Sequence, residues 1–386
     1  MRRSFILLCC LLCCFITASA NSIDWRVGQR ISLVGSQSAT YYNRSYVIPK
    51  FQVENLNFPQ IELNGELLAF SDHNRNYNSG EIKELYLSFS KELYTVSAGA
   101  KTFSFSETFG VNIMDILSPR NYESYILDDT FWSYRSVWAM DLNLFFDKLT
   151  AHLILIPRAS RPKFPELDSP YDLRKKLGVS RFRLPEYSWL DDGEAALRLG
   201  YLSDSGIDAT LLFATHLGRQ MTLVINPALE IEWQNRRVTT FGTTFNYSYG
   251  DWVYRGDFLY THDDLVPNGL FSVKSSRHWQ SIVGADWSGS SEKFIGVQHH
   301  FDSVENNHWA SFLYRHLLLS ERLELEVMFF TGINSDDLWL RPRIGWLADS
   351  YALHLQYDLL DASVSSGVLG HFKYGDRLLF SGEYFF

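Results

Sequence analysis

Beyond its first twenty residues, this chain contains no cysteine. All four cysteines of the 386-residue sequence lie within 9–14, inside one apolar run. Arg2 and Arg3 precede that run and a small-residue Ala-Ser-Ala site follows it, so 1–20 is predicted to be a cleaved secretory signal peptide. Once this segment is removed, the chain can form no disulfide, no thiol nucleophile and no thiolate metal site.

The sequence also lacks a basic block and a long hydrophobic run. It carries 35 Lys and Arg against 44 Asp and Glu, and two of those arginines belong to the predicted signal peptide. Such an acidic chain is a poor partner for nucleic acid. After residue 20, no apolar run reaches the roughly 18 residues that a transmembrane helix requires. Helical periodicity is scarce as well, which disfavours an ordinary periplasmic enzyme.

What the chain does contain is strand-like alternation, and its last ten residues, RLLFSGEYFF, show the pattern. One face carries apolar and small residues, and the other carries Arg377, Ser381 and Glu383. A period of two predicts a β-strand whose two faces meet different surroundings. The same alternation recurs in segments of about ten residues with aromatics near their ends. The other segments are 197–201, 229–234, 322–329, 338–346, 351–358 and 368–374.

Charged residues on the second face of strand after strand could not fill a packed core without leaving buried ions unpaired. Hydrocarbon outside and water inside satisfy both faces, and only a closed barrel leaves no backbone edge in lipid. The 11 Trp, 21 Tyr and 28 Phe suit the aromatic girdles of such a barrel. We therefore predict an all-β fold, one transmembrane antiparallel outer-membrane β-barrel over 21–386, with about 20 strands and a range of about 16–20.

The final strand is predicted to close the barrel. Its Gly382, Tyr384 and Phe386 resemble the C-terminal signal by which the outer-membrane barrel assembly machinery recognises its clients, although the glycine falls one place later than usual. With Phe386 in the periplasm and a turn at 374–376, the long connection 261–277 would also be periplasmic. That arrangement inverts the usual rule of short periplasmic turns and long outer loops.

Two stretches break the alternation. Segment 106–129 is expected to have a short helix-like centre ending before Pro119 and to fold into the lumen as a constriction loop. Segment 158–192 contains four of the eleven prolines and is expected to be a long surface loop.

The stretch VSAGAKTFSFSETFGVNIMDILSPRNYESYILDD resembles a segment of a large, uncharacterised family of proteobacterial outer-membrane barrels, which is distantly similar to alginate export porins. Further pieces agree in order, among them LTAHLILIPRASRPKFP and LWLRPRIGW, so the resemblance covers most of 90–386. The family's Gly-Arg-Gln and Trp-Gly are replaced here by the tripeptide 99–101 and by Phe105-Ser106. The resemblance implies a porin-like barrel and no particular substrate.

Catalytic and metal chemistry find little support. No Gly-x-Ser-x-Gly elbow is present. The neighbouring His299 and His300 would face opposite sides of a strand and could not chelate one ion together. We therefore expect no enzyme activity, no metal and no cofactor. A Ser, a His and a carboxylate converging on the lipid-facing rim would be the observation that favours a hydrolase.

The lumen-facing charges are the most informative candidates for a functional site. They could simply pair across strands and brace a water-filled wall, or they could form a selectivity constriction. Five arginines and several carboxylates are predicted to point inward, with Glu230, Glu232, Glu324 and Glu326 among the latter. The candidate constriction residues are Asp115, Arg120, Glu123, Asp128, Asp129, Arg135, Arg198, Arg255, Asp257, Arg341 and Arg343.

We therefore expect a passive channel for small solutes in the Gram-negative outer membrane, with outer-membrane lipid as its surroundings. The acids of 106–129 are expected to bind the inward arginines and hold that loop across the opening. The alternative is a plugged barrel that serves as the outer-membrane component of a lipid or polymer export system. Whether several copies assemble into a homo-oligomer stays open.

Overall fold

The computed structural model describes residues 22–35, 39–54, 60–124, 126–166, 169–172, 174, 179, 181–218, 222–226, 228, 230–268, 272–304, 306–363, 369, 372–373 and 375–386. Regular structure in this part of the chain is almost entirely β-strand, and the helix α2 (Thr130–Ser133) is four residues long. Within the described residues, no helix is long and apolar enough to cross a bilayer.

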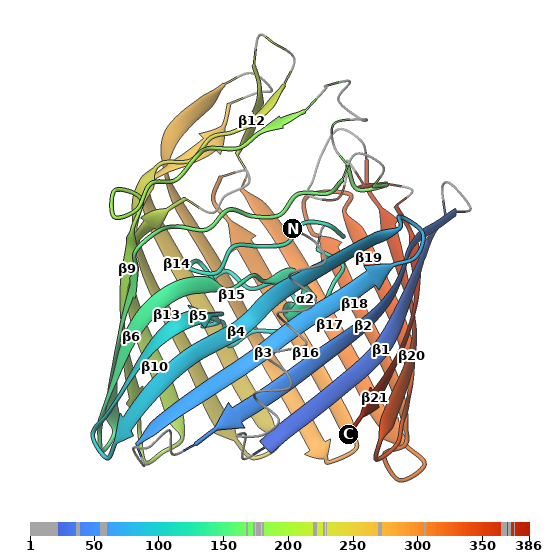
Figure 1. The fold of residues 1–386 in the computed structure, drawn as a ribbon, viewed down its shortest axis with the longest axis horizontal. Coiled ribbons are helices and arrows are strands. Elements are labelled where there is room, and N and C mark those ends of the chain that lie inside the picture. Colours follow the sequence, from blue (N-terminus) through green and yellow to red (C-terminus); the bar gives the residue numbers. More distant parts are fainter. Residues whose placement is uncertain are drawn as a thin grey trace.

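Eighteen strands form one closed antiparallel barrel, because each strand pairs with the next around the sheet and β21 pairs with β1 (Figure 1). The barrel strands are β1 (Ser22–Val34), β2 (Ala39–Val53), β3 (Ile61–Asp72), β4 (Tyr77–Lys91), β5 (Tyr94–Lys101), β6 (Val137–Phe146), β7 (Leu149–Ile156), β9 (Glu194–Leu202), β10 (Ile207–Leu217), β13 (Arg237–Tyr249), β14 (Trp252–Pro267), β15 (Val273–Ser290), β16 (Lys293–Asp302), β17 (Asn307–Leu318), β18 (Leu323–Gly332), β19 (Leu338–Leu347), β20 (Tyr351–Asp361) and β21 (Arg377–Phe385). The predicted closed β-barrel is confirmed, and its strand count lies inside the predicted range.

Strand β21 shows how the two faces differ. Leu378, Phe380 and Tyr384 point outward and are 36%, 41% and 50% exposed, whereas Arg377 and Leu379 point inward and are buried. The same alternation runs through the neighbouring strand β20, in which Asp358 is buried between exposed or partly exposed apolar side chains. An apolar outer wall and a largely polar inner wall therefore follow from the period of two in the sequence.

The connections sort into a short-turn end and a long-loop end. The short turns, among them 92–93, 147–148, 250–251 and 291–292, lie at the end where β1 begins and β21 finishes. The longest connections, 102–136, 157–193, 218–236 and 362–376, lie at the other end, as does 268–272 between β14 and β15. At the short-turn end, only 54–60 between β2 and β3 exceeds four residues. The usual rule therefore holds, and the predicted inversion is wrong.

The predicted inversion arose because one of the predicted strands does not exist. The segment 368–374 was predicted to be a strand, but Leu369, Phe372 and Lys373 lie outside any strand in the connection from β20 to β21. The other members of the predicted strand lie outside the described residues. Leu369 and Phe372 are buried in an apolar cluster with inward side chains of the barrel wall. These two residues are three positions apart, so a strand would place them on opposite faces, yet both are buried at the mouth of the barrel. Removing this strand reverses the side assigned to every earlier connection.

A second predicted barrel strand, 229–234, is also wrong. Residues Ile231–Trp233 form β12, which pairs with β11 (Leu223–Ile225) and β8 (Phe182–Arg183) in a separate small sheet beyond the long-loop end (Figure 1). Glu230 and Glu232 therefore do not lie on the barrel wall, and Glu230 pairs with Arg181 of the neighbouring connection. Alternation over so few residues is equally typical of a loop hairpin.

Candidate constriction inside the barrel

Residues 102–136 connect β5 to β6, and instead of leaving the barrel they run through its interior. Helix α2 belongs to this interior segment and lies within the barrel outline in Figure 1. The segment forms hydrogen bonds with side chains of β1, β2, β4, β14, β19 and β21, which lie on different sides of the ring. The interior segment therefore bridges the lumen and does not simply lie along one wall.

The first half of the interior segment is held by apolar packing. Met114 and Leu117 are fully buried, and together with Phe103, Phe105 and Ile116 they form one cluster with the inner wall. The wall contributes side chains from β6, β7, β9, β10 and β14, namely Val137, Ala139, Ile154, Ile156, Ala196, Leu212, Ala214 and Leu259. Gly242 of β13 leaves the space that Met114 occupies, because a Cβ atom there would lie 2.5 Å from the Met114 methyl group.

Asp115 organises this half. Its carboxylate accepts hydrogen bonds from the backbone N–H groups of Phe105 (2.6 Å) and Ser106 (3.2 Å), and from the side chains of Ser104 and Asn112 (both 3.1 Å). These bonds close a loop on itself, and the described residues between 106 and 118 form no helix. The predicted helix-like centre is wrong because the carboxylate takes backbone donors that a helix would place elsewhere.

Polar contacts with β14 complete the anchoring of the first half. Asp257 accepts from the Glu107 backbone N–H (3.3 Å) and from the Thr108 hydroxyl (3.1 Å). Arg255 donates to the Glu107 carbonyl (3.1 Å) and forms an ion pair with Asp286 of β15 (2.6 Å). The first half therefore contacts the wall mainly through apolar side chains and backbone groups.

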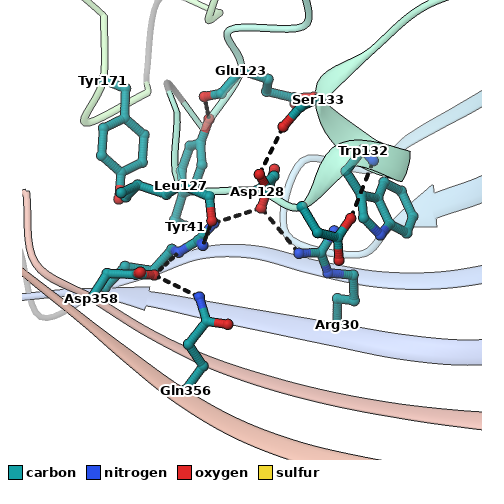
Figure 2. A network of polar contacts seen from close by, with 12 residues as sticks. Arg30, Tyr41, Glu123, Leu127, Asp128, Trp132, Ser133, Tyr171, Gln356 and Asp358 are labelled. Atoms are coloured by element: carbon teal, nitrogen blue, oxygen red, sulfur yellow. Dashed lines mark hydrogen bonds and ion pairs between the residues drawn. The ribbon is translucent and has the colours of Figure 1, made fainter. Parts of the chain in front are cut away.

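The second half of the interior segment is held by buried ion pairs, which Figure 2 shows around Asp128. The Asp128 carboxylate contacts Arg30 of β1 (3.0 Å) and Arg377 of β21 (2.7 Å). Arg377 also pairs with Asp358 of β20 (2.9 Å), and Asp358 pairs with Arg341 of β19 (2.6 Å). Arg341 and Arg377 both donate to the Leu127 carbonyl as well. Three strands, β1, β19 and β21, thus converge on two consecutive residues, and Asp358 of β20 holds two of the arginines in place.

A second acidic anchor lies nearby. Glu123 pairs with Arg44 of β2, with Arg75 (3.5 Å) and with Lys163 (3.4 Å) of the long connection to β9. Burial alone would raise the pKa of Glu123, but Arg44 and Lys163 hold it below its ordinary value. In the same way, Arg30 and Arg377 overcome the effect of burial and hold the pKa of Asp128 below its ordinary value. Both carboxylates therefore stay ionised at neutral pH.

The remaining predicted residues are spread over the lumen. Asp129 caps α2 by accepting from the Trp132 N–H. Arg120 donates to the Asn112 carbonyl, Arg135 donates to the Arg161 carbonyl, and Arg198 lies over the Phe105 ring. Arg343 contacts Glu324 (2.7 Å) and Glu326 (3.0 Å) on the wall. Of the expected arginines, Arg255 and Arg341 donate to backbone carbonyls of the interior segment, and Arg255 also lies 3.9 Å from the Glu107 carboxylate. Glu123 and Asp128 bind other cations.

The sequence analysis missed these cations, among them Arg30, Arg44 and Arg377, and the relay residue Asp358. Lys83 of β4, which donates to the carbonyls of Phe131 and Tyr134, was missed as well. Two of these residues, Arg377 and Asp358, could have been predicted to face the lumen. They lie on the polar faces of segments in which polar and apolar residues alternate. The missing information was the order of the strands around the ring, which brings β1, β2 and β21 side by side.

Water reaches ion pairs on the inner wall. The side chains of Arg26, Arg255 and Arg343 remain 31%, 29% and 27% exposed although each is paired with a carboxylate. A fully packed interior would leave such side chains as buried as Arg377. The lumen therefore holds solvent as well as the interior segment.

Other chemistry in the described residues is limited. No group of three or more metal-ligating side chains is placed to hold a metal ion within that part of the chain. His300 points inward to Ser311 (2.9 Å), and His299 points outward to His308 (3.2 Å), as the strand period predicts. On the outer rim, Ser45 contacts His73 (2.8 Å), but no carboxylate that the structure describes hydrogen-bonds this histidine.

No family model and no curated protein matches the sequence. Solved structures do match the fold. OpdK of Pseudomonas aeruginosa in complex with vanillate has a TM-score of 0.58 at 9% identity, over 94% of this chain and 98% of OpdK. OccAB2 of Acinetobacter baumannii has a TM-score of 0.57 at 12% identity, over 95% and 97% of the two chains. Salmonella typhi OmpF in complex with daunomycin has a TM-score of 0.51 at 8% identity, over 95% and 97%.

These neighbours are outer-membrane porins, and the chain shares their porin-like β-barrel over nearly its whole length. At such low identities the likeness is one of fold.

Proposed function

We propose that this chain is an outer-membrane channel through which small solutes pass passively, and that the interior segment 102–136 narrows it. The observation that carries the proposal is that the segment bridges a lumen whose wall-bound ion pairs remain in contact with water. An apolar outer wall, a polar inner wall and a closed sheet are the combination that suits a water-filled barrel in lipid.

Selectivity is proposed to arise from charged groups on and around the interior segment. The residues proposed to line or shape the constriction are Asp115, Arg120, Glu123, Asp128, Asp129, Arg135, Arg198, Arg255, Asp257, Arg341 and Arg343, to which we add Arg30, Arg44 and Arg377. OpdK and OmpF were solved with the small organic molecules vanillate and daunomycin. Small organic solutes are accordingly the class that we propose for this channel, with no enzymatic step.

The wild-type protein itself provides the test. After refolding and insertion into a planar bilayer, it should give discrete, ohmic single-channel steps, and liposomes that contain it should swell in solutions of small sugars or organic anions. A folded protein that gives neither steps nor swelling would contradict a channel and would favour a plugged barrel in an export system.

The location and assembly of the barrel are part of the same proposal. We propose that 1–20 directs export, that the long-loop end faces outward, and that the barrel assembly machinery recognises Gly382, Tyr384 and Phe386. The resemblance of 90–386 to uncharacterised proteobacterial barrels supports this placement. Phe386, whose backbone bonds Trp25 of β1, lies at the closing seam. Replacing Phe386 with Asp should leave little heat-modifiable protein in the outer membrane, and normal levels would contradict the proposed signal. Cross-linking in membranes would show whether the barrel forms a homo-oligomer.

A further inference from the structure

A hollow of about 620 Å³ lies on the outer wall of the barrel where β15, β16, β17 and β18 run side by side. Pockets that hold drug-sized ligands have volumes of about 300–1,000 Å³. The outward side chains that line it are Val283, Ala285, Val297, Ala310, Phe312 and Phe329. Ala285 and Ala310 are small, and the larger side chains beside them leave a dent that an extended hydrocarbon chain would fill.

Polar and ionisable side chains lie at one end of this hollow. His299 lines it and shares a hydrogen bond with His308 of β17 (3.2 Å). The second ring nitrogen of each histidine takes no hydrogen bond from the residues that the structure describes. Both rings point away from the lumen, on the same face as the exposed Val297 and Phe312. Ionisable side chains on a lipid-facing wall are uncommon and often mark a binding site.

The histidine pair lies toward the long-loop end, at the level of an aromatic cluster. The ring of His308 lies 4.8 Å from that of Phe301, which lies 4.6 Å from that of Trp279. Trp279 is 43% exposed, as a tryptophan at a membrane–water interface would be. Arg277, two residues farther toward the long-loop end on β15, is exposed as well. Hydrocarbon therefore gives way here to a basic, hydrogen-bonding surface.

We propose that this surface binds one molecule of an anionic, phosphate-bearing membrane lipid. An acyl chain lies in the hollow, and the phosphate accepts a hydrogen bond from the His299–His308 pair, with the positive charge of Arg277 farther toward the long-loop end on β15. The lipid is favoured over a second protein copy because the apolar hollow and the basic groups follow one another along the barrel axis. A lipid presents its acyl chain and its anionic headgroup in that order. This inference rests on the proposed membrane location.

Fluorescence quenching by brominated lipids tests the binding site. The protein is reconstituted in phosphatidylcholine vesicles that contain increasing fractions of either brominated phosphatidylglycerol or brominated phosphatidylcholine. The signal of Trp279 is obtained by subtracting the Trp279→Phe variant from the wild type. Brominated phosphatidylglycerol should quench this signal at about fivefold lower mole fraction than brominated phosphatidylcholine.

Two variants test whether the lipid preference depends on the His299–His308 pair. The double variant His299→Ala with His308→Ala should lose the preference for phosphatidylglycerol. His316→Ala should keep it, because His316 also lies on β17 but near the short-turn end, beside Tyr314. A heat-modifiable band on electrophoresis shows that each variant is folded.

The other possible results of the quenching experiment each contradict a different part of the proposal. Equal quenching by the two lipids in the wild type rules out recognition of an anionic headgroup, and a preference that survives in the double histidine variant rules out the histidine pair as its site. Quenching of other tryptophans but not of Trp279 would mean that another protein covers the hollow. If no tryptophan were quenched by either lipid, the membrane location itself would be wrong, and the proposed function would fall with it.

Discussion

The two halves of the interior segment are anchored by different physical forces. From Phe103 to Leu117 the anchor is an apolar cluster, and its one buried carboxylate, Asp115, is satisfied within the segment. From Arg120 to Ser133 the main anchor is a set of buried ion pairs around Glu123 and Asp128, to which the buried side chains of Leu127 and Trp132 add apolar packing. Apolar packing is insensitive to charge, whereas a buried ion pair fails strongly when one partner is removed.

This difference indicates which half can move. The apolar half belongs to the same core as the barrel wall and should behave as a fixed part of it. The charged half is attached at a few points, most of which involve arginines of β1, β2, β19 or β21, and Lys83 of β4 adds hydrogen bonds to two backbone carbonyls. We therefore expect the size of the opening to depend mainly on the charged half.

The largest effect is expected from removing both acidic anchors, with Asp128→Ala combined with Glu123→Ala. Arg30, Arg44 and Arg377 then lose buried partners, and breaking such a pair costs about 3–5 kcal/mol. The second half should detach, so single-channel conductance should rise and become noisy. Unchanged conductance in a folded double variant would mean that the acids do not hold the segment.

A smaller effect on conductance is expected from the apolar half, although its cost in stability is similar. Leu117→Ala should lower the free energy of unfolding by about 2–5 kcal/mol, because it leaves a cavity in a fully buried cluster. The ionic anchors remain, so conductance should change much less than in the double acidic variant. Thermal unfolding followed by electrophoretic mobility measures the first quantity, and bilayer recordings measure the second. A Leu117→Ala channel as open as the acidic variant would reverse the assignment of the movable half.

Lowering the pH should weaken the anchoring of the charged half and leave the apolar anchoring of the first half unchanged, without any mutation. The pKa values of Glu123 and Asp128 are held below the ordinary 4.5 and 3.8. Stabilisation from a carboxylate with a depressed pKa is fully present above its ordinary pKa and is lost as the pH falls toward the pKa in the folded protein. Conductance should therefore be constant between about pH 7 and pH 5 and should rise only in stronger acid. A rise centred near neutral pH would point to other titrating groups.

Arg343→Glu is expected to change the size of the opening least of these variants, but to change the ion preference of the channel. Arg343 pairs with wall carboxylates and not with the interior segment, so its replacement should leave conductance near that of the wild type. The reversal potential in a salt gradient should shift toward cation selectivity, since a positive group on the inner wall becomes negative. Arg341→Glu should act differently, because Arg341 donates to Leu127 and its loss should also loosen the segment. Identical behaviour of the two variants would show that bracing and selectivity cannot be separated.

Much of the fold could be predicted from the period of two. Strands such as β18 and β21 have long, clean alternation, and their outward and inward residues follow from it. The prediction failed at 368–374, where Leu369 and Phe372 would lie on opposite faces of a strand but both pack inside the mouth. Alternation reports that two faces differ and does not report which surroundings each face meets.

The candidate site could be predicted only in part. The apolar and acidic composition of 106–129 indicated a segment that folds inward, because its apolar side chains would be poorly placed in open water. Its partners could not be identified, because contacts such as that between Asp128 and Arg377 join residues 249 positions apart in the chain. Such pairs depend on which strands close the ring and on their register, and neither quantity is encoded in a local pattern.

The most direct test of the constriction is the single-channel conductance of a variant in which 110–125 is replaced by a short glycine-serine linker. This change removes Met114 and Leu117 from the apolar half and Glu123 from the charged half while leaving the barrel strands intact. If the interior segment narrows a water-filled lumen, conductance should rise well above that of the wild type, and larger solutes should pass in liposome swelling. Conductance and size limit equal to those of the wild type, in a variant shown to be folded, would contradict the role of the segment as the constriction.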